Sequence, residues 1–284
     1  MKDTILYGDC RKILSQFDEK SRCCITSPPY YGLRDYGGEE YQIGLEQSPE
    51  EYVNEMVKVF REVRNILTDD GTLWLNIGDS YYNYRPGKGA NYPQQSVSNT
   101  RQDLPTNSNK RANKLEGLKE KDLIGIPWML AFALRNDGWY LRQDIIWNKP
   151  NPMPESVRDR CTKSHEYIFL FSKNRKYYFN VDAIKEPTND GTGLKRKKSV
   201  WNVKTKPYKG AHFAVYPPEL IEPCILAGSE KNDIILDPFM GSGTTAMVAK
   251  QLGRYYNGCE LNRDYNNLIQ KRTGEGIGTL SKFL

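Results

Sequence analysis

The stretch Ile234-Ile235-Leu236-Asp237-Pro238-Phe239-Met240-Gly241-Ser242-Gly243-Thr244-Thr245 decides the fold, because it places a glycine-rich turn between a strand pattern and a helix pattern. Residues 234–236 form an apolar run typical of a buried strand, and residues 244 to about 252 have helical periodicity. The turn lacks the third glycine of a dinucleotide-binding loop, and no Gly-Lys-Ser/Thr follows it. We therefore expect a zwitterionic ligand without phosphates, with an amino group for an acidic residue to satisfy.

Strand and helix patterns alternate along the rest of the chain. The expected strands are 4–7, 23–26, 72–77, 139–147, 165–172, 234–236 and 255–259, and the expected helices are 10–17, 48–67, 127–136, 217–227, 244–252 and 263–272. Such alternation predicts an α/β fold with a doubly wound, mostly parallel sheet.

A second motif, Thr26-Ser27-Pro28-Pro29-Tyr30, follows the apolar residues of an early strand. Two consecutive prolines cannot continue a sheet, so the chain leaves it as a stiff, extended loop. Loops at the carboxyl ends of strands collect reacting groups, because the scaffold holds them while they reach the ligand. We expect this loop and the glycine-rich turn to form one site.

Positive charge is concentrated in two segments of this 284-residue chain, whose net charge is +6. Residues 85–121 contain eight basic and three acidic side chains, and residues 173–212 contain eleven and three. The rest of the chain is acidic on balance. This division predicts a catalytic body with basic attachments that face a polyanion, since lysine and arginine provide most non-specific affinity for nucleic acids.

Composition excludes several other classes of protein. The six cysteines show no Cys-x-x-Cys spacing and there are two histidines, so we expect no metal site and no disulfide framework. No apolar run reaches membrane length and no signal-peptide pattern is present, so we expect a cytoplasmic protein. Residues 81–121 are poor in large apolar side chains and are expected to form a mobile basic loop.

Together, Thr26–Tyr30 and the run Asp237–Thr245 resemble the amino-methyltransferases of DNA that use S-adenosylmethionine. The order of the motifs, with Ser-Pro-Pro-Tyr first, is similar to the permuted beta class. The resemblance implies a Rossmann-like methyltransferase fold, with residues 1–172 as its catalytic part, 173–212 as an inserted target-recognition region and 213–284 as its S-adenosylmethionine-binding part. It implies double-stranded DNA as a partner, and a cognate restriction endonuclease as a candidate partner.

The same resemblance implies the roles of individual residues. Ser27 and the carbonyl of Pro28 would accept hydrogens from an exocyclic amine, Pro29 would help to fix that loop, and Tyr30 would stack on a base rotated out of the duplex. The residues implied to bind the cofactor are Asp9 (adenine), Asp237, Phe239, Gly241, Ser242, Gly243 and Thr244 (methionine part) and Glu260 (ribose). The residues implied to bind DNA are Lys195, Arg196, Lys197 and Lys198.

Several readings remain open. Ser27 at the first position of its motif favours cytosine N4 over adenine N6 as the acceptor, by resemblance alone. An RNA or protein methyltransferase and an inactive nucleic-acid-binding module are further alternatives. A cytosine-C5 enzyme would need a cysteine nucleophile, but Cys224 lies in an apolar helical stretch, which favours a buried thiol.

Overall fold

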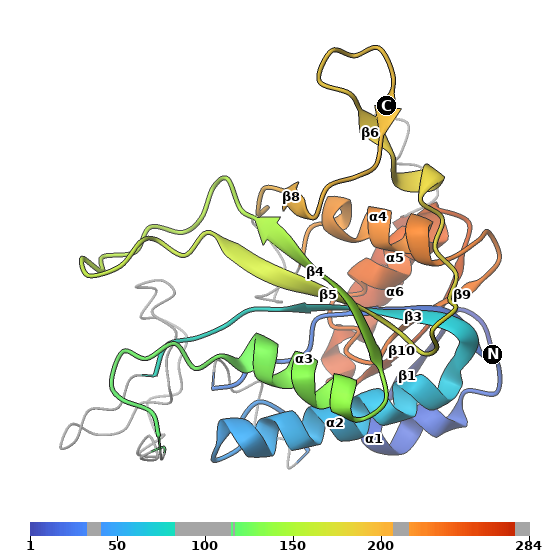
Figure 1. Ribbon diagram of the computed structural model, residues 1–284. Helices are drawn as coiled ribbons and strands as arrows, with labels where there is room; N and C mark the ends of the chain where they lie inside the picture. The colour runs from blue at the N-terminus through green and yellow to red at the C-terminus, as the bar shows by residue number, and fades with distance from the viewer. Residues whose placement is uncertain (33–40, 83–114, 116, 207–215, 276–284) are drawn as a thin grey trace.

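An eight-stranded sheet forms the centre of the molecule (Figure 1). The computed structural model describes residues 1–32, 41–82, 115, 117–206 and 216–275. The strands lie in the order β1 (Thr4–Tyr7), β10 (Tyr255–Glu260), β9 (Ile234–Asp237), β2 (Ser21–Thr26), β3 (Leu67–Ile77), β5 (His165–Ser172), β4 (Tyr140–Asn148) and β8 (Val200–Asn202). Within the described ranges, no helix is both long and apolar enough to cross a membrane.

All neighbouring strands pair in parallel, except that β5 runs antiparallel to both β3 and β4. This arrangement confirms the predicted mostly parallel sheet. The direction of β5 was not predicted, and it matters for the site. Because β5 is reversed, its first residues lie at the edge where the parallel strands end.

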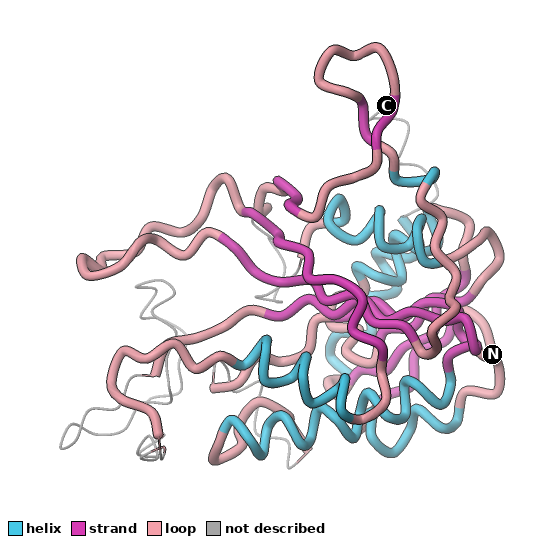
Figure 2. Tube along the Cα trace, in the orientation of Figure 1, coloured by secondary structure: helices cyan, strands magenta, loops and turns pink. Residues whose placement is uncertain are grey.

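Helices cover both faces of the sheet, as expected for a doubly wound fold (Figures 1 and 2). The first layer contains α1 (Cys10–Ile13), α2 (Pro49–Ile66) and α3 (Ile126–Asn136), and the second contains α4 (Pro218–Gly228), α5 (Thr244–Gln251) and α6 (Asn266–Glu275). Each layer buries its own apolar cluster against the sheet. Short 3₁₀ turns occupy Leu14–Gln16, Asp182–Ile184 and Arg263–Tyr265, so the helix expected over 10–17 is divided between α1 and a 3₁₀ turn.

The start of α2 shows how sequence sets an element boundary. Ser48 Oγ accepts a hydrogen bond from the backbone N–H of Glu51 at 3.2 Å, and Pro49 occupies the first helical turn. Glu51 reaches back to the N–H of Gln47 at 2.9 Å, one residue before the cap. These bonds begin an 18-residue helix whose buried face includes Met56 and Phe60.

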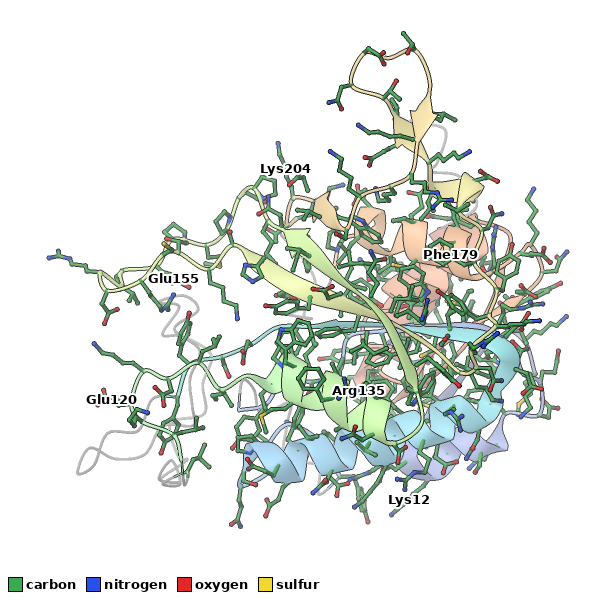
Figure 3. All side chains as sticks on the ribbon, in the orientation of Figure 1. Lys12, Glu120, Arg135, Glu155, Phe179 and Lys204 are labelled. Carbon is green, nitrogen blue, oxygen red and sulfur yellow. The ribbon has the colours of Figure 1, made fainter. Side chains whose placement is uncertain are left out.

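The segment 173–206 is partly built into the core. Phe179 stacks on Trp74 with ring centroids 6.1 Å apart and lies between the sheet and the second helix layer (Figure 3). Trp201, on the edge strand β8, is 5% exposed. Trp201 is therefore part of the core, and Phe179 is partly buried against the same cluster. The part of this segment that projects is a hairpin of β6 (Glu186–Pro187) and β7 (Leu194–Lys195) (Figure 1).

Some sequence-based expectations fall outside the described residues. Most of the loop predicted over 81–121 consists of residues 83–114 and 116, which the structure does not describe. Residues 207–212 of the predicted insert also lie outside the described residues. The domain boundaries at 172/173 and 212/213 therefore remain predictions. Figure 2 shows the described loops before α3 and between β4 and β5 extending from the same side of the sheet.

Candidate active site

The two sequence motifs meet at one edge of the sheet because β2 and β9 are neighbours. Their register pairs Cys24 with Leu236, so both strands end at the same level. Thr26 Oγ1 then donates a 2.6 Å hydrogen bond to Asp237 Oδ1, joining residues 211 positions apart in the sequence. The loop containing Ser27 and the glycine-rich turn therefore lie side by side.

The Asp237 carboxylate is the centre of a buried hydrogen-bond network. Its donors are Thr26 Oγ1 (2.6 Å), the Phe239 N–H (3.0 Å), Thr245 Oγ1 (2.5 Å) and Tyr216 OH (3.2 Å). The side chain is 1% exposed, and burial raises its pKa to about 6 although the four donors oppose the shift. Asp237 thus binds the two loops together from inside. Its predicted contact with the amino group of a ligand stays a prediction.

The glycine-rich turn is held by side chains from β10 and α6. Glu260 Oε2 accepts from the N–H of Gly241 at 2.7 Å, and burial raises the pKa of this carboxyl to about 7. One guanidinium nitrogen of Arg272 donates to Ser242 Oγ and Thr244 Oγ1, both at 2.7 Å. Gly243 has φ +80°, a left-handed conformation in which a side chain would be strained.

Asp9 lies next to Glu260, because β1 pairs with β10 and the N–H of Gly8 donates to the Glu260 carbonyl at 2.9 Å. The Asp9 carboxylate caps α1 and forms an ion pair with Arg11 at 2.9 Å. Phe239 is half-buried beside the turn and packs against the cluster of the first helix layer. The structure thus brings every residue predicted to bind the cofactor to one edge of the sheet.

The proline loop is anchored at both ends. Tyr52 OH, on α2, donates to the carbonyl of Pro29 at 2.8 Å, and Tyr30 OH donates to Glu166 Oε2 at 2.8 Å. Pro28 is buried and Ser27 is half-exposed. Ser27 Oγ lies 3.5 Å from Tyr30 OH, to which it donates.

Comparison with known proteins decides the family. A family model described as DNA methylase, N6_N4_Mtase, matches residues 21–271. The chain belongs to the N6/N4 DNA methylase family. This confirms the resemblance drawn from the two motifs, and the fold it implied.

The methylase is also similar to individual proteins. It is 50% identical over 273 residues to the type II methyltransferase M.Cfr9I of Citrobacter freundii, covering 95% of this chain and 87% of that protein. It is 51% identical over 270 residues to M.SmaI of Serratia marcescens, covering 94% and 89%. Among solved structures, the PvuII DNA methyltransferase (cytosine-N4-specific) aligns with TM-score 0.68 at 19% identity, covering 96% of this chain and 86% of that one. The complex of M1.HpyAVI with SAM aligns with TM-score 0.60 at 20% identity, covering 95% and 98%.

Sequence reasoning missed a group of side chains beside Tyr30 in the methylase. Glu166, the second residue of β5, accepts hydrogen bonds from Tyr30 and from Asn76 Nδ2 (3.3 Å), and it forms an ion pair with Lys149. The pattern His-Glu-Tyr at the start of a strand gave one usable signal, since a carboxyl there is unusual among apolar neighbours. Only the antiparallel direction of β5 places it at this edge.

The residues predicted to bind DNA lie elsewhere on the methylase. Lys195 is on β7 and donates to Asn189 Oδ1 at 2.6 Å, while Lys197 lies over the Trp201 ring at 5.2 Å. Arg196 and Lys198 are exposed. In the described part of the chain, these four side chains have no contact with the two motifs, so their role stays a prediction.

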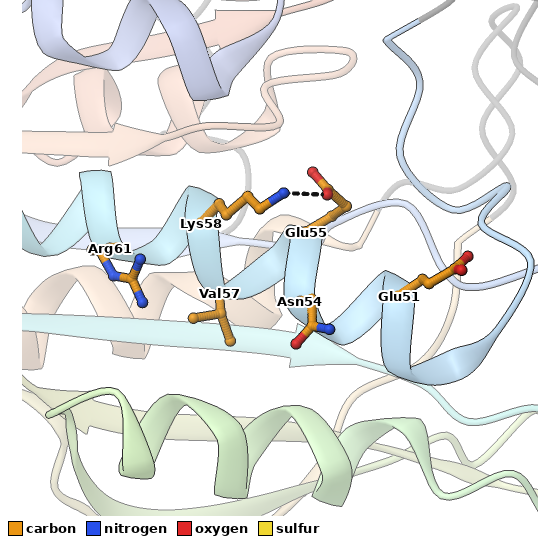
Figure 4. A pocket seen from close by; sticks show the side chains of 6 residues that line it. All are labelled: Glu51, Asn54, Glu55, Val57, Lys58 and Arg61. Atoms are coloured by element: carbon orange, nitrogen blue, oxygen red, sulfur yellow. Dashed lines mark hydrogen bonds and ion pairs between the residues drawn. The ribbon is translucent and has the colours of Figure 1, made fainter.

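Two other features of the methylase are separate from the site. Cys224 is fully buried in α4 and burial raises its thiol pKa well above the ordinary value, as expected for a core cysteine. A shallow hollow on the outward side of α2 is lined by Glu51, Asn54, Glu55, Val57, Lys58 and Arg61 (Figure 4). The ion pair between Lys58 and Glu55 bridges one turn of that helix.

Proposed function

We propose that this methylase transfers a methyl group from S-adenosylmethionine to the exocyclic N4 amine of a cytosine rotated out of double-stranded DNA. The observation that supports this most directly is the bond between Thr26 and Asp237. It places a loop suited to an amine acceptor beside a turn suited to a methyl donor. Reactants bound at the two loops would meet without large movement, and such orientation accounts for much of a transferase's rate.

The residues around the turn suit S-adenosylmethionine. Gly241 and Gly243 allow the backbone to approach a ligand closely, with φ of +53° and +80°. The Glu260 carboxyl, 8% exposed and with a raised pKa, is suited to neutral hydroxyl donors such as those of a ribose. Phe239, Ser242 and Thr244 would hold the methionine part.

When bound, S-adenosylmethionine supplies the methyl group: the amine lone pair forms the new N–C bond, the C–S electron pair passes to sulfur, and the amine nitrogen then releases one proton to solvent water. Ser27 and the carbonyl of Pro28 would accept the two N–H hydrogens and hold the lone pair toward the donor. Tyr30 would stack on the base. Because the amine of a base is delocalised and weakly nucleophilic, this orientation is the main contribution of the protein.

Two observations favour cytosine N4 as the acceptor. The first motif begins with the neutral hydroxyl of Ser27, and the PvuII enzyme that shares the fold is cytosine-N4-specific. Adenine N6 is the second candidate, because the family model covers both amines. The similarity to M.Cfr9I and M.SmaI supports a type II modification enzyme, which would work beside a cognate restriction endonuclease.

We assign target recognition to residues 173–212, with Lys195, Arg196, Lys197 and Lys198 contacting phosphates. The projecting β6–β7 hairpin supports this assignment, since it leaves the domain surface and ends in a basic run (Figure 1).

The experiment that tests the acceptor is digestion of methylated DNA to nucleosides, followed by mass identification of the product. Labelled N4-methylcytosine is the expected result. N6-methyladenine would overturn the choice of base while leaving the reaction class intact. If the protein methylates RNA and not duplex DNA in parallel reactions, the proposed substrate is wrong.

A further inference from the structure

Glu166 is a largely buried carboxylate beside the proline loop. Its side chain is 16% exposed. The carboxylate accepts hydrogen bonds from Tyr30 OH in the proline loop and from Asn76 Nδ2 on β3, and it forms an ion pair with Lys149, which follows β4. Buried ion pairs add little net stability, because removing both charges from water costs about as much as their attraction returns. The location of this ion pair beside the proline loop therefore needs an explanation other than stability.

The hydrogen bonds around this carboxylate have a single direction. An ionised carboxylate only accepts, so Tyr30 must donate to Glu166 and its oxygen is left to accept from Ser27. The Ser27 hydroxyl hydrogen then points toward Tyr30, and the lone pairs of Ser27 are left for other donors. The Ser27–Tyr30 distance of 3.5 Å is long, as is common for such bonds before substrate binds.

We propose that Glu166 is a positioning residue which, through Tyr30, turns Ser27 into a hydrogen-bond acceptor for the target amine; this inference rests on the proposed methyl transfer. A serine hydroxyl can donate or accept, and one that donated to the amine nitrogen would occupy the lone pair needed for attack. The chain Ser27 to Tyr30 to Glu166 removes that possibility. The same argument holds whether the amine belongs to cytosine or adenine.

Lys149 preserves the direction of these hydrogen bonds, from Ser27 to Tyr30 to Glu166, by keeping the Glu166 carboxylate ionised. Burial alone would raise the pKa of the Glu166 carboxyl, but the ion pair with Lys149 and the bonds from Tyr30 and Asn76 outweigh it, so the pKa lies below its ordinary value. Lys163, whose own pKa is lowered by burial, and His165 also face this group. Of these three side chains, Lys149 forms the ion pair with Glu166 among the described residues. Its ammonium also lies 4.4 Å from the centroid of the Trp147 ring.

Gly78 makes the contact between Tyr30 and Glu166 sterically possible. A Cβ at position 78 would lie 2.8 Å from Tyr30 Cε2 and 3.2 Å from Glu166 Cγ. The residue after β3 therefore has to be glycine for the aromatic ring and the carboxylate to approach across the strand end.

The test is a double-mutant cycle on single-turnover methyl transfer, with Glu166→Gln, Tyr30→Phe and the double variant. Each single change should lower the rate about tenfold or more, and the double variant should be no slower than the worse single variant. Affinities for S-adenosylmethionine and DNA, measured by calorimetry and filter binding, should stay within about twofold. The matched control is Glu230→Gln, because Glu230 is an exposed carboxyl at the opposite end of the sheet. This variant should leave the methyl-transfer rate and both affinities unchanged.

A pH profile separates positioning from a merely structural role. In Lys149→Met, the largest influence that offsets the burial of Glu166 is lost, so the pKa of this carboxyl should rise and the rate should increase with pH through a new inflection. That inflection should vanish when Glu166→Gln is added. Profiles of Lys149→Met and wild type that run parallel, or rate losses that multiply in the double-mutant cycle, would overturn the inference. Failure of the wild-type protein to methylate any DNA would instead overturn the proposed function itself.

Discussion

Ser27 is the residue on which the proposed chemistry depends most. Its neighbours Pro28 and Pro29 restrict the backbone, and its hydroxyl lies 3.5 Å from Tyr30 OH. The sequence motif was sufficient to single out Ser27. The identity of the group that orients it required the folded structure.

We expect Ser27→Ala to lower methyl transfer about a hundredfold while leaving DNA affinity unchanged, because it removes one acceptor for the amine and no contact with phosphate. Transfer of tritiated methyl groups and a filter-binding assay on the same preparation measure the two quantities. Equal activity in the variant and the wild type would show that the hydroxyl takes no part in the reaction.

Gly78→Ala should impair methyl transfer with little loss of fold. The added methyl group would clash with Tyr30 and push it away from Glu166, and position 78 has no left-handed backbone that would add strain. Gly274→Ala, near the end of α6, is the matched control, because a Cβ there meets nothing within 4 Å. The same initial rate in both alanine variants would contradict the expected contact.

Glu260 should make stability depend on pH. Its folded pKa of about 7 lies above the ordinary value of 4.5, so the folded protein holds this proton more tightly than the unfolded chain. Stability therefore falls as pH rises from 4.5 to 7, and wild type should lose about 3 kcal/mol relative to Glu260→Gln across that window. Urea unfolding of both proteins without ligand, at the two pH values, measures the difference. A constant offset between them would rule out the raised pKa.

At the scale of elements, β5 and the β6–β7 hairpin have the largest consequences. Strand β5 was expected from its apolar run, but periodicity does not reveal strand direction. Its antiparallel course brings Glu166 to the site. Residues 173–212 were predicted as a basic recognition region, and the structure adds that they contain this hairpin and that Trp201, which follows it, packs inward.

Replacing Lys195, Arg196, Lys197 and Lys198 by glutamine should weaken DNA binding and make it less dependent on salt. Each lost phosphate contact should reduce the slope of log affinity against log salt by about 1. Titrations at several salt concentrations give this slope, with Lys231 and Lys250, near the opposite edge of the sheet, replaced as a control. An unchanged slope would remove the segment from the DNA interface.

At the scale of the whole molecule, cofactor binding should stabilise the fold. A ligand at a hundredfold excess over its dissociation constant adds about 2.7 kcal/mol, which for a domain of this size raises Tm by about 5 °C. Thermal unfolding with and without S-adenosylmethionine tests this. Gly243→Ala, which strains the left-handed turn and brings a Cβ within 3.2 Å of Ile269, should abolish the shift, whereas Gly193→Ala should retain it. No shift in wild type would show that the folded protein does not bind S-adenosylmethionine at that concentration.

The sequence by itself determined the alternation of strands and helices, the two motifs and the family, because periodicity and short motifs depend on residues close together in the chain. Tertiary structure alone decided what those motifs touch. Thr26 meets Asp237 across 211 positions, and Tyr30 meets Glu166 across 136. Such contacts follow from strand order and direction, which depend on packing throughout the sheet. The glycine-rich turn therefore remains the predicted cofactor loop, but the acidic residue that begins it is an internal tie between the two halves of the site.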